Sequence, residues 1–153
     1  MRGRILGIDV GARRVGLAIS DPSGTLARPL TTLTVSGSID ATNQVVDAIA
    51  RLSVEDDGLA AVVVGLPARL DGTPNAQTSS VAAFIDALRA RTSLAVETEG
   101  EQLTSREAER RLALKERDWR RRKEKLDAAA AAIILQDYLD RRSPLEEPVK
   151  RSR

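Results

Sequence analysis

The sequence of 153 residues contains no cysteine and no histidine, and these two absences restrict the chemistry open to it. Without cysteine there can be no disulfide bond, no thiolate nucleophile and no zinc–sulfur site. Without histidine there can be no Ser-His-Asp triad, no imidazole acid–base catalysis and few zinc or iron sites. Carboxylates, Lys, Ser, Thr and a single Tyr remain, and carboxylate ligands suit hard cations such as Mg2+ or Mn2+. A catalyst built from these residues is biased towards phosphate chemistry.

Long hydrophobic runs and aromatic side chains are also scarce. No stretch approaches the roughly 18 uninterrupted apolar residues of a membrane span, and the N-terminus has no signal-peptide core or cleavage site. We therefore expect a cytoplasmic protein without a membrane partner. Phe, Tyr, Trp and Met occur once each in a chain that is 42% apolar. The core must then consist of Val, Ile, Leu and Ala, which suits a β-sheet covered by helices.

The hydrophobic pattern predicts three consecutive strands followed by alternating helices and strands. Val15, Leu17 and Ile19 alternate along one face of a strand, whereas the unbroken apolar run 59–66 is typical of a strand buried on both faces. The expected elements are strands 4–10, 15–20 and 27–35, helix 39–52, strand 59–66, helix 76–91, strand 94–98, helix 104–115 and helix 127–140.

This order predicts an α/β fold. We expect a mixed five-stranded sheet, an antiparallel meander over its first three strands and parallel over the last two, with helices on both faces. No internal repeat or linker divides the chain, so we expect one domain over residues 1–142. Residues 143–153 contain two prolines and several charges, and are predicted to form a disordered tail.

Asp9 is the residue that the expected fold explains least. Aspartate is depleted in strands, yet Asp9 lies inside the first one, between Gly7 and Gly11. Glycines at these positions permit another group or another backbone to approach closely. A buried carboxylate requires a cation or hydrogen-bond donors, because burying it without them is costly. Asp9 is therefore a candidate metal ligand; the alternative is that it caps the adjacent turn.

Two further acids could converge on Asp9. Asp127 begins the last helix, where Asp is also a good N-cap, and the alanines at 128–132 would let that helix lie close against the sheet. Glu101 follows the fifth strand and, taken alone, is an ordinary surface acid. Three such carboxylates could hold two divalent ions about 4 Å apart, which activate a water molecule and stabilise the leaving oxygen of a phosphodiester.

Basic residues are concentrated in the last third of the chain. Residues 1–100 carry 9 basic and 11 acidic side chains, whereas residues 101–153 carry 15 and 11. Side chains in such a run can contact the phosphates of a nucleic acid, or can form a solvated helix end or loop. Trp119 lies within the run and could stack on a base or anchor the loop. The candidate nucleic-acid-binding residues are Arg13 and Arg14, at a predicted hairpin turn, and Arg121, Arg122, Lys123 and Lys125.

Several motifs in a fixed order resemble those of the YqgF/RuvX proteins of bacteria over about residues 4–140. They are Gly7-Ile8-Asp9-Val10-Gly11, Arg13-Arg14-Val15-Gly16-Leu17-Ala18, Val64-Gly65-Leu66-Pro67, Leu70-Asp71-Gly72-Thr73, Leu103-Thr104-Ser105 and Lys125-Leu126-Asp127-Ala128-Ala129-Ala130. The resemblance implies a ribonuclease H-like fold related to the RuvC-type junction resolvases. It also implies maturation of the 5′ end of 16S ribosomal RNA or, by another description of the family, resolution of Holliday junctions.

The same resemblance assigns catalytic and metal-binding roles to Asp9, Glu101 and Asp127, with two Mg2+ or Mn2+ ions bound together with substrate. One motif departs from the family pattern. The family has Asp-Glu-Arg-Leu-Thr after the fifth strand, and this chain has Gly100-Glu101-Gln102-Leu103-Thr104. Glu101 is therefore the preferred candidate for the second acid, and Glu99 is the alternative. Because Arg is absent at 102, we expect substrate binding to rely more on Arg13, Arg14 and the segment 120–125.

The sequence thus predicts a divalent-metal-dependent endonuclease acting on structured nucleic acid, with precursor 16S rRNA preferred as substrate. A resolvase acting on branched DNA is the alternative, and it would need a dimer with a two-fold axis. We expect a monomer or a weak homodimer. A second alternative is a nucleic-acid-binding relative without catalysis. An actin-like or sugar-kinase-like ATPase is disfavoured, because the chain has neither a second such domain nor a Gly-x-x-x-x-Gly-Lys phosphate loop.

Overall fold

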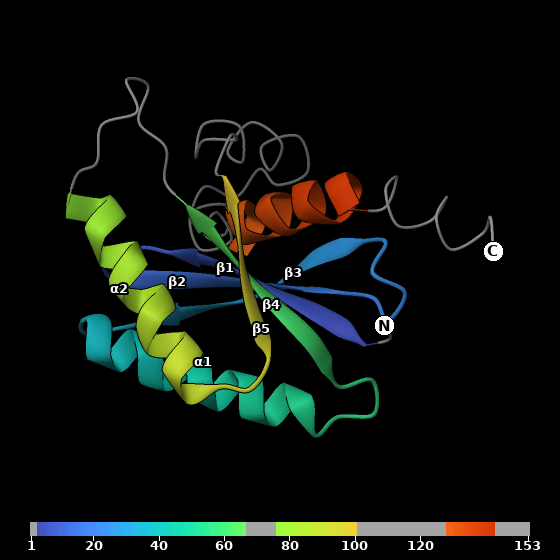
Figure 1. The fold of residues 1–153 in the computed structure, drawn as a ribbon, viewed down its shortest axis with the longest axis horizontal. Helices are drawn as coiled ribbons and strands as arrows, with labels where there is room; N and C mark the ends of the chain where they lie inside the picture. Colours follow the sequence, from blue (N-terminus) through green and yellow to red (C-terminus); the bar gives the residue numbers. More distant parts are fainter. Residues whose placement is uncertain (1–2, 67–75, 101–127, 143–153) are drawn as a thin grey trace, which may run out of the picture.

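The computed structural model describes residues 3–66, 76–100 and 128–142 (Figure 1). The predicted helix 104–115 and tail 143–153 lie outside these segments. In chain order the described strands and helices are β1 (Arg4–Val10), β2 (Arg14–Ser20), β3 (Ala27–Thr34), α1 (Ser38–Ser53), β4 (Leu59–Leu66), α2 (Ala76–Arg91), β5 (Ala95–Gly100) and a last helix described over residues 128–142, called helix 128–142 below.

The strands form one five-stranded sheet in the order β3-β2-β1-β4-β5. β1, β2 and β3 pair antiparallel, while β4 lies parallel to β1 and β5 parallel to β4. The predicted α/β fold class is therefore confirmed, and most expected bounds agree to within one or two residues. The largest difference is at β5, which continues through Glu99 and Gly100 because its backbone pairs with β4 as far as Gly65 and Leu66.

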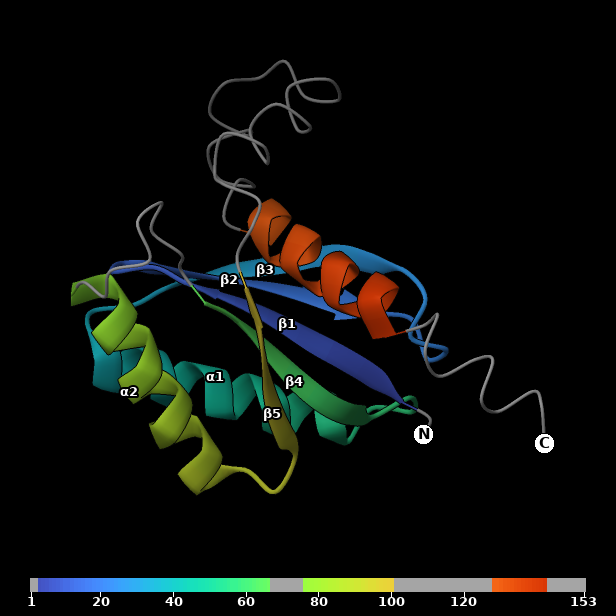
Figure 2. The same cartoon turned by 45° about the horizontal axis from the view of Figure 1, so that its top comes forward.

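Helices cover both faces of the sheet. Figures 1 and 2 show α1 and α2 on one face and helix 128–142 on the other. Alternate residues of a strand point to opposite faces, so β1 sends Leu6 and Ile8 towards α1 and α2, and Ile5 towards helix 128–142. In the described part of the chain no helix is both long and apolar enough to cross a membrane.

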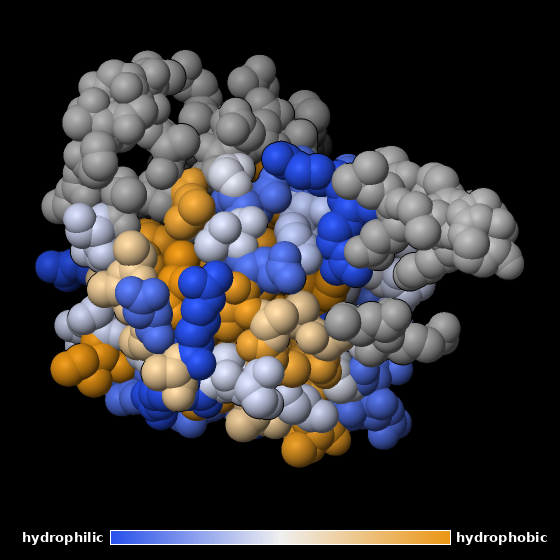
Figure 3. Space-filling model, viewed as in Figure 1, coloured by the Kyte–Doolittle hydropathy of each residue, from blue (hydrophilic) through white to orange (hydrophobic). Residues whose placement is uncertain are grey.

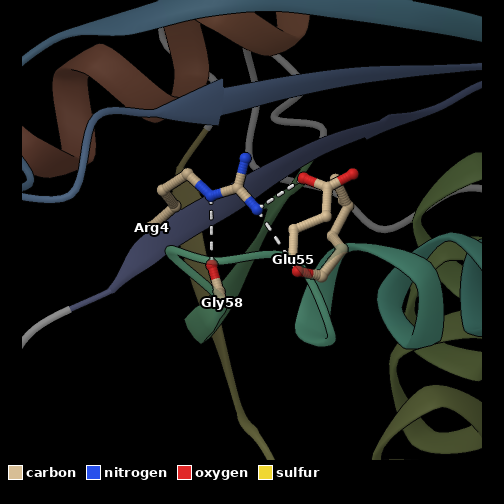
Figure 4. Close-up of polar contacts among 4 residues, drawn as sticks. Arg4, Glu55 and Gly58 are labelled. Atoms are coloured by element: carbon tan, nitrogen blue, oxygen red, sulfur yellow. Dashed lines mark hydrogen bonds and ion pairs between the residues drawn. The ribbon is translucent and has the colours of Figure 1, made fainter.

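Arg4 fixes the start of β1 to the connection between α1 and β4 (Figure 4). Its Nε donates to the carbonyl oxygen of Gly58 at 3.1 Å, and its Nη2 donates to the carbonyl oxygen of Leu52 at 3.2 Å. The same Nη2 lies 2.9 Å from Oε1 of Glu55. Gly58 has a φ of 60°, a left-handed conformation that favours glycine. These contacts satisfy backbone carbonyls at the end of α1 and hold β1 beside β4.

Helix 128–142 lies directly on the sheet because two strand residues beneath it are glycines. A β-carbon on Gly7 would lie 2.8 Å from Cβ of Leu135, and a β-carbon on Gly65 would lie 2.6 Å from Cδ1 of Ile134. Ala128, Ala130 and Ala131 of the first turn are buried. The prediction that the alanine run packs closely against the sheet is confirmed.

Gln136 adds a polar contact between helix 128–142 and the start of β3. Its Oε1 accepts from the backbone N–H of Ala27 at 2.9 Å, and its Nε2 donates to the carbonyl oxygen of Thr25 at 3.0 Å. The side-chain amide pairs with the β3 chain in the way a neighbouring strand would. It therefore fixes one side of the helix to the edge of the sheet.

Candidate active site

Asp9 and Glu99 lie in one row that crosses the sheet. Asp9 pairs with Gly16 of β2, and Gly65 of β4 pairs with Glu99 of β5. The register of Ile8 with Val64 places Asp9 level with Gly65. Neighbouring strands are about 4.8 Å apart, so the backbones at Asp9 and Glu99 are separated by about 10 Å. Both side chains are on the face that helix 128–142 covers.

Asp9 is partly buried near the end of β1. Its cross-strand neighbours on both sides are glycines, which bring no side chain of their own next to its carboxylate. The tight turn predicted after it is present: the backbone N–H of Gly11 donates to the carbonyl oxygen of Arg14 at 2.9 Å. Arg13 and Arg14 are both exposed at this turn. Two predicted nucleic-acid-binding residues are therefore at the same end of β1 as Asp9.

Glu99 differs from Asp9 in its surroundings. It is the buried acid of the described segments, with 4% of its surface exposed, and its Oε2 accepts a hydrogen bond from Nη2 of Arg141 at 2.5 Å. Burial raises the pKa of Glu99; the Arg141 guanidinium opposes this rise and the Asp137 carboxylate adds to it. The side chain of Arg141 itself is 63% exposed. Figure 3 shows hydrophilic side chains over the last turns of helix 128–142.

The sequence interpretation did not single out Arg141, although a signal for it exists. Tyr138 follows Ile134 by four residues and Arg141 follows Tyr138 by three, which places all three on one face of a helix. Ile134 and Tyr138 are both buried against the sheet. A cation on the buried face of a helix predicts a buried or half-buried acid on the surface against which that face packs. Glu99 is that acid.

The other predicted site residues fall outside the described segments. They are Glu101, Asp127, Arg121, Arg122, Lys123 and Lys125. The structure therefore places Asp9, Arg13 and Arg14 at one end of the sheet, and it leaves the convergence of the three predicted acids untested. Ala128, which directly follows Asp127, is the first described residue of its helix.

Asp9 suits a hard divalent cation in donor type and in position. Its carboxylate supplies the oxygen ligands that Mg2+ and Mn2+ prefer, and it lies at the end of a strand, partly exposed. Within residues 3–66, 76–100 and 128–142, no group of three or more possible metal ligands gathers. A complete metal site would thus need ligands from outside these segments, where Glu101 and Asp127 are the predicted ones.

Comparison with known proteins decides the family. Residues 3–141 match the model of a family described as "RuvX: Holliday junction resolvase". The chain belongs to the RuvX family. This match covers nearly the whole sequence and agrees with the resemblance drawn from the motifs around Asp9, Gly65 and Asp127.

Curated relatives match over most of this chain and over most of their own length. A protein from Chloroflexus aggregans is 45% identical over 141 residues, which cover 92% of this chain and 96% of that protein. A protein from Koribacter versatilis is 39% identical over 151 residues, which cover 97% and 95%. Both carry the name "Putative pre-16S rRNA nuclease".

Solved structures show that this RuvX-family chain has the fold of RuvC-like resolvases. RuvC of T. thermophilus, solved in complex with a Holliday junction substrate, matches with a TM-score of 0.53 at 18% identity, covering 92% of this chain and 95% of RuvC. The fowlpox virus Holliday junction resolvase matches with a TM-score of 0.52 at 14% identity, covering 90% and 98%. The predicted ribonuclease H-like fold is confirmed.

Proposed function

We propose that this chain is a divalent-metal-dependent endonuclease that cleaves structured nucleic acid, with precursor 16S rRNA as its substrate and Asp9 as its central metal ligand. The position of Asp9 carries the proposal. It is a partly buried carboxylate inside a strand, with glycines on both sides in its row, in a chain that matches the RuvX family over residues 3–141. The choice of rRNA rests on the names of the curated relatives.

Glu101 is the proposed second acid, in preference to Glu99. Glu99 is 4% exposed and its carboxylate is engaged by Arg141, so its oxygens are poorly available to a metal that must also contact substrate and water. Glu101 follows Glu99 by two residues, the spacing at which residues of a continuing strand share a face. The burial and pairing of Glu99 therefore support Glu101 as the acid that matches the family pattern.

Asp127 is the proposed third acid. It directly precedes Ala128, and helix 128–142 runs antiparallel to β1 across the sheet, so that its first turn is towards the end of β1 that carries Asp9 (Figure 2). Gly7 contacts the helix at Ala131 and Leu135. Asp9 is two residues beyond Gly7, which is about 6 to 7 Å along a strand. Asp127 precedes Ala131 by four residues in the sequence.

The remaining chemistry follows from these residues. Divalent ions bound by Asp9, Glu101 and Asp127 would supply an activated water and would stabilise the charge that develops on the leaving oxygen. Arg13 and Arg14 would hold the phosphates beside the cleaved bond, and the basic segment 120–125 would hold phosphates further along the nucleic acid. The chain's own residues thus bind the backbone, orient the phosphodiester and retain the ions.

Resolution of Holliday junctions is the second candidate. Two observations favour it: the description of the RuvX family as Holliday junction resolvases, and the fold shared with two such resolvases. It requires two symmetric cuts and hence a two-fold dimer on the junction. A relative that binds without cleaving is the third candidate, which the changed residues Gly100 and Gln102 favour.

The experiment offers the purified chain a precursor 16S rRNA fragment and a four-way DNA junction, each in Mg2+, in Mn2+ and in EDTA. We expect metal-dependent cleavage of the rRNA fragment near its 5′ end and slower cleavage of the junction. Symmetric paired cuts in the junction, with the rRNA left intact, would replace the first candidate by the second. Tight binding with both backbones intact in Mn2+ would leave only the third.

Two variants decide which acid fills the uncertain position. Glu101→Gln is expected to lower the cleavage rate at least about 100-fold, because it removes a metal ligand. Glu99→Gln is expected to lower it less than about tenfold, because its neutral side chain still accepts a hydrogen bond from Arg141. Rates are measured at saturating substrate and metal. A reversal of this order would assign the metal to Glu99 and contradict the role given to Glu101.

A further inference from the structure

An ion pair with a buried carboxylate and an exposed guanidinium joins the far end of helix 128–142 to the strand that precedes Glu101. Arg141 is in the last turn of the helix, and its guanidinium donates to the Glu99 carboxylate at 2.5 Å. Glu99 is 4% exposed, and Asp137 of the same helix is near enough to raise its pKa. A buried carboxylate with a second acid beside it requires its cation. The position of the helix end therefore depends on this contact.

The middle of the helix rests on two glycines. Ile134 lies over Gly65, and Leu135 lies over Gly7, in each case so close that a β-carbon would collide. The contact at Gly7 is made by Cβ of Leu135 and by the carbonyl oxygen of Ala131, and neither atom can move aside by side-chain rotation when the angle of the helix changes. The helix can thus tilt about residues 134 and 135 more easily than it can slide across them.

The parts of the helix on the two sides of Leu135 are nearly equal in length. Ala128 precedes Leu135 by seven residues and Arg141 follows it by six, which at 1.5 Å per residue gives lengths of about 10 and about 9 Å. A movement of 1 Å at Arg141 would therefore move the first turn by about 1 Å. Shifts of that size at a catalytic group can cost about 100-fold in rate.

We propose that Arg141 and Glu99 are a positioning pair, which sets the angle of helix 128–142 on the sheet and thereby the distance between its first turn and Asp9. The inference rests on the proposed function, because Asp127 directly precedes that first turn. Neither residue of the pair touches the metal or the substrate. Arg141 acts through the helix, and Glu99 acts by holding Arg141.

Four variants test the pair: Arg141→Gln, Arg141→Lys, Glu99→Gln and the double variant Arg141→Gln/Glu99→Gln. Arg142→Gln is the matched control. It removes the same charge from the same turn, but Arg142 faces Tyr138, with its guanidinium carbon 5.4 Å from the ring centre and Nη1 3.5 Å from the hydroxyl. Each variant is measured for kcat, for KM, for Mn2+ affinity without substrate by electron paramagnetic resonance, and for thermal unfolding.

Arg141→Gln is expected to lower kcat about tenfold and Mn2+ affinity about fivefold, with KM unchanged, because the acids are displaced while the nucleic-acid contacts remain. Arg141→Lys and Arg142→Gln are expected to stay within about threefold of the wild type. The double variant is expected to bind Mn2+ and to cleave better than Arg141→Gln, since it removes the unpaired buried charge.

Two results would overturn the positioning role, and a third would overturn the proposed function alone. An Arg141→Gln variant with a lower melting temperature but wild-type kcat and Mn2+ affinity would overturn the positioning role. A rise in KM alone would also overturn it, because Arg141 would then contact the nucleic acid. If the wild type cleaves nothing while Arg141→Gln still weakens Mn2+ binding, the positioning role stands and the proposed nuclease function fails.

Discussion

Asp9 and Glu99 are carboxylates in the same row of the sheet, and their surroundings give them different properties. Asp9 is partly exposed at the end of β1, and its neighbours in the row, on β2 and β4, are glycines. Glu99 lies under helix 128–142, with 4% of its surface exposed and its charge balanced by Arg141. An acid that must exchange a metal and substrate needs access, whereas one that holds a helix needs burial and a fixed partner.

Asp21 shows how a carboxylate stabilises a turn without a catalytic role. Its Oδ1 accepts from the backbone N–H groups of Thr25 and Leu26, each at 2.8 Å, and the Ser23 hydroxyl donates to its Oδ2. Hydrogen bonds from Leu26 and Ser23 lower the pKa of Asp21 to about 2. The charged form is thus favoured in the folded protein, and the turn between β2 and β3 gains stability from it.

The lowered pKa predicts the pH dependence of this contribution. Because the folded pKa of Asp21 lies below its unfolded value, the stabilisation is complete above about pH 4 and is lost as the pH falls towards 2. We expect Asp21→Asn to lower the free energy of unfolding by about 1 kcal/mol at pH 7, after allowance for solvent screening. The difference from the wild type should shrink between pH 4 and pH 2.

Urea denaturation at pH 7, 4 and 2.5 measures this difference. Asp47→Asn is the control, because Asp47 is exposed on α1 and should change stability by less than about 0.5 kcal/mol at every pH. An Asp21→Asn difference that grows towards low pH would contradict the assignment.

Residue patterns predicted Asp9 but not the pairing of Glu99. An Asp between glycines in an apolar strand stands out in the sequence alone. Glu99 and Arg141 are 42 residues apart, and their contact depends on how far β5 extends and on how helix 128–142 crosses it. Neither is encoded locally, since both follow from tertiary packing. The alternation of β5 and the helical spacing of Arg141 supplied partial signals only.

At the scale of elements, helix 128–142 and the glycines beneath it act as one packing unit. Gly7 contacts the helix through Cβ of Leu135 and the carbonyl oxygen of Ala131, which would be 2.8 and 3.2 Å from an added β-carbon. Neither atom can rotate away. Gly65 faces Cδ1 of Ile134, the far end of a flexible side chain. The two contacts should therefore differ in their tolerance of a methyl group.

This difference predicts the ranking of two substitutions. Gly7→Ala is expected to lower the free energy of unfolding by about 2 to 3 kcal/mol, because the helix must lift from the sheet. Gly65→Ala is expected to cost about 1 kcal/mol, because Ile134 can change rotamer. Equilibrium urea denaturation measures both.

Ile134→Val provides the matched test, since it removes the methyl group that an alanine at 65 would meet. In the Gly65→Ala background it should recover part of the loss, although it costs about 1 kcal/mol in the wild type. If Gly65→Ala were more destabilising than Gly7→Ala, the described packing of Leu135 on Gly7 and of Ile134 on Gly65 would be wrong.

Hydrophobic periodicity was sufficient to predict most elements. Strand β4 and helix α2 have the predicted bounds, and the meander of β1, β2 and β3 is the expected one. The strand predicted over 94–98 ended two residues too early and left out Glu99 and Gly100. The burial and pairing of Glu99 depend on Arg141, which belongs to a distant helix.

At the scale of the whole molecule, the carboxyl ends of the three parallel strands meet at one end of the sheet. Asp9 is near the end of β1, Glu99 is near the end of β5, and Gly65 is near the end of β4 between them. In open α/β sheets, this end is where ligands bind. We propose that the site of this RuvX-family chain lies at this end.

The central claim is that the Asp9 carboxylate is required for phosphodiester cleavage and not for folding or binding. Asp9→Asn keeps the shape of the side chain and removes the charge that a divalent ion needs. Cleavage of the precursor rRNA fragment by this variant, compared with Asp47→Asn and the wild type in Mg2+, is the most direct measurement. We expect a loss of at least about 100-fold in rate, with unchanged affinity and melting temperature, and no loss for Asp47→Asn. Cleavage by Asp9→Asn at the wild-type rate would contradict the account.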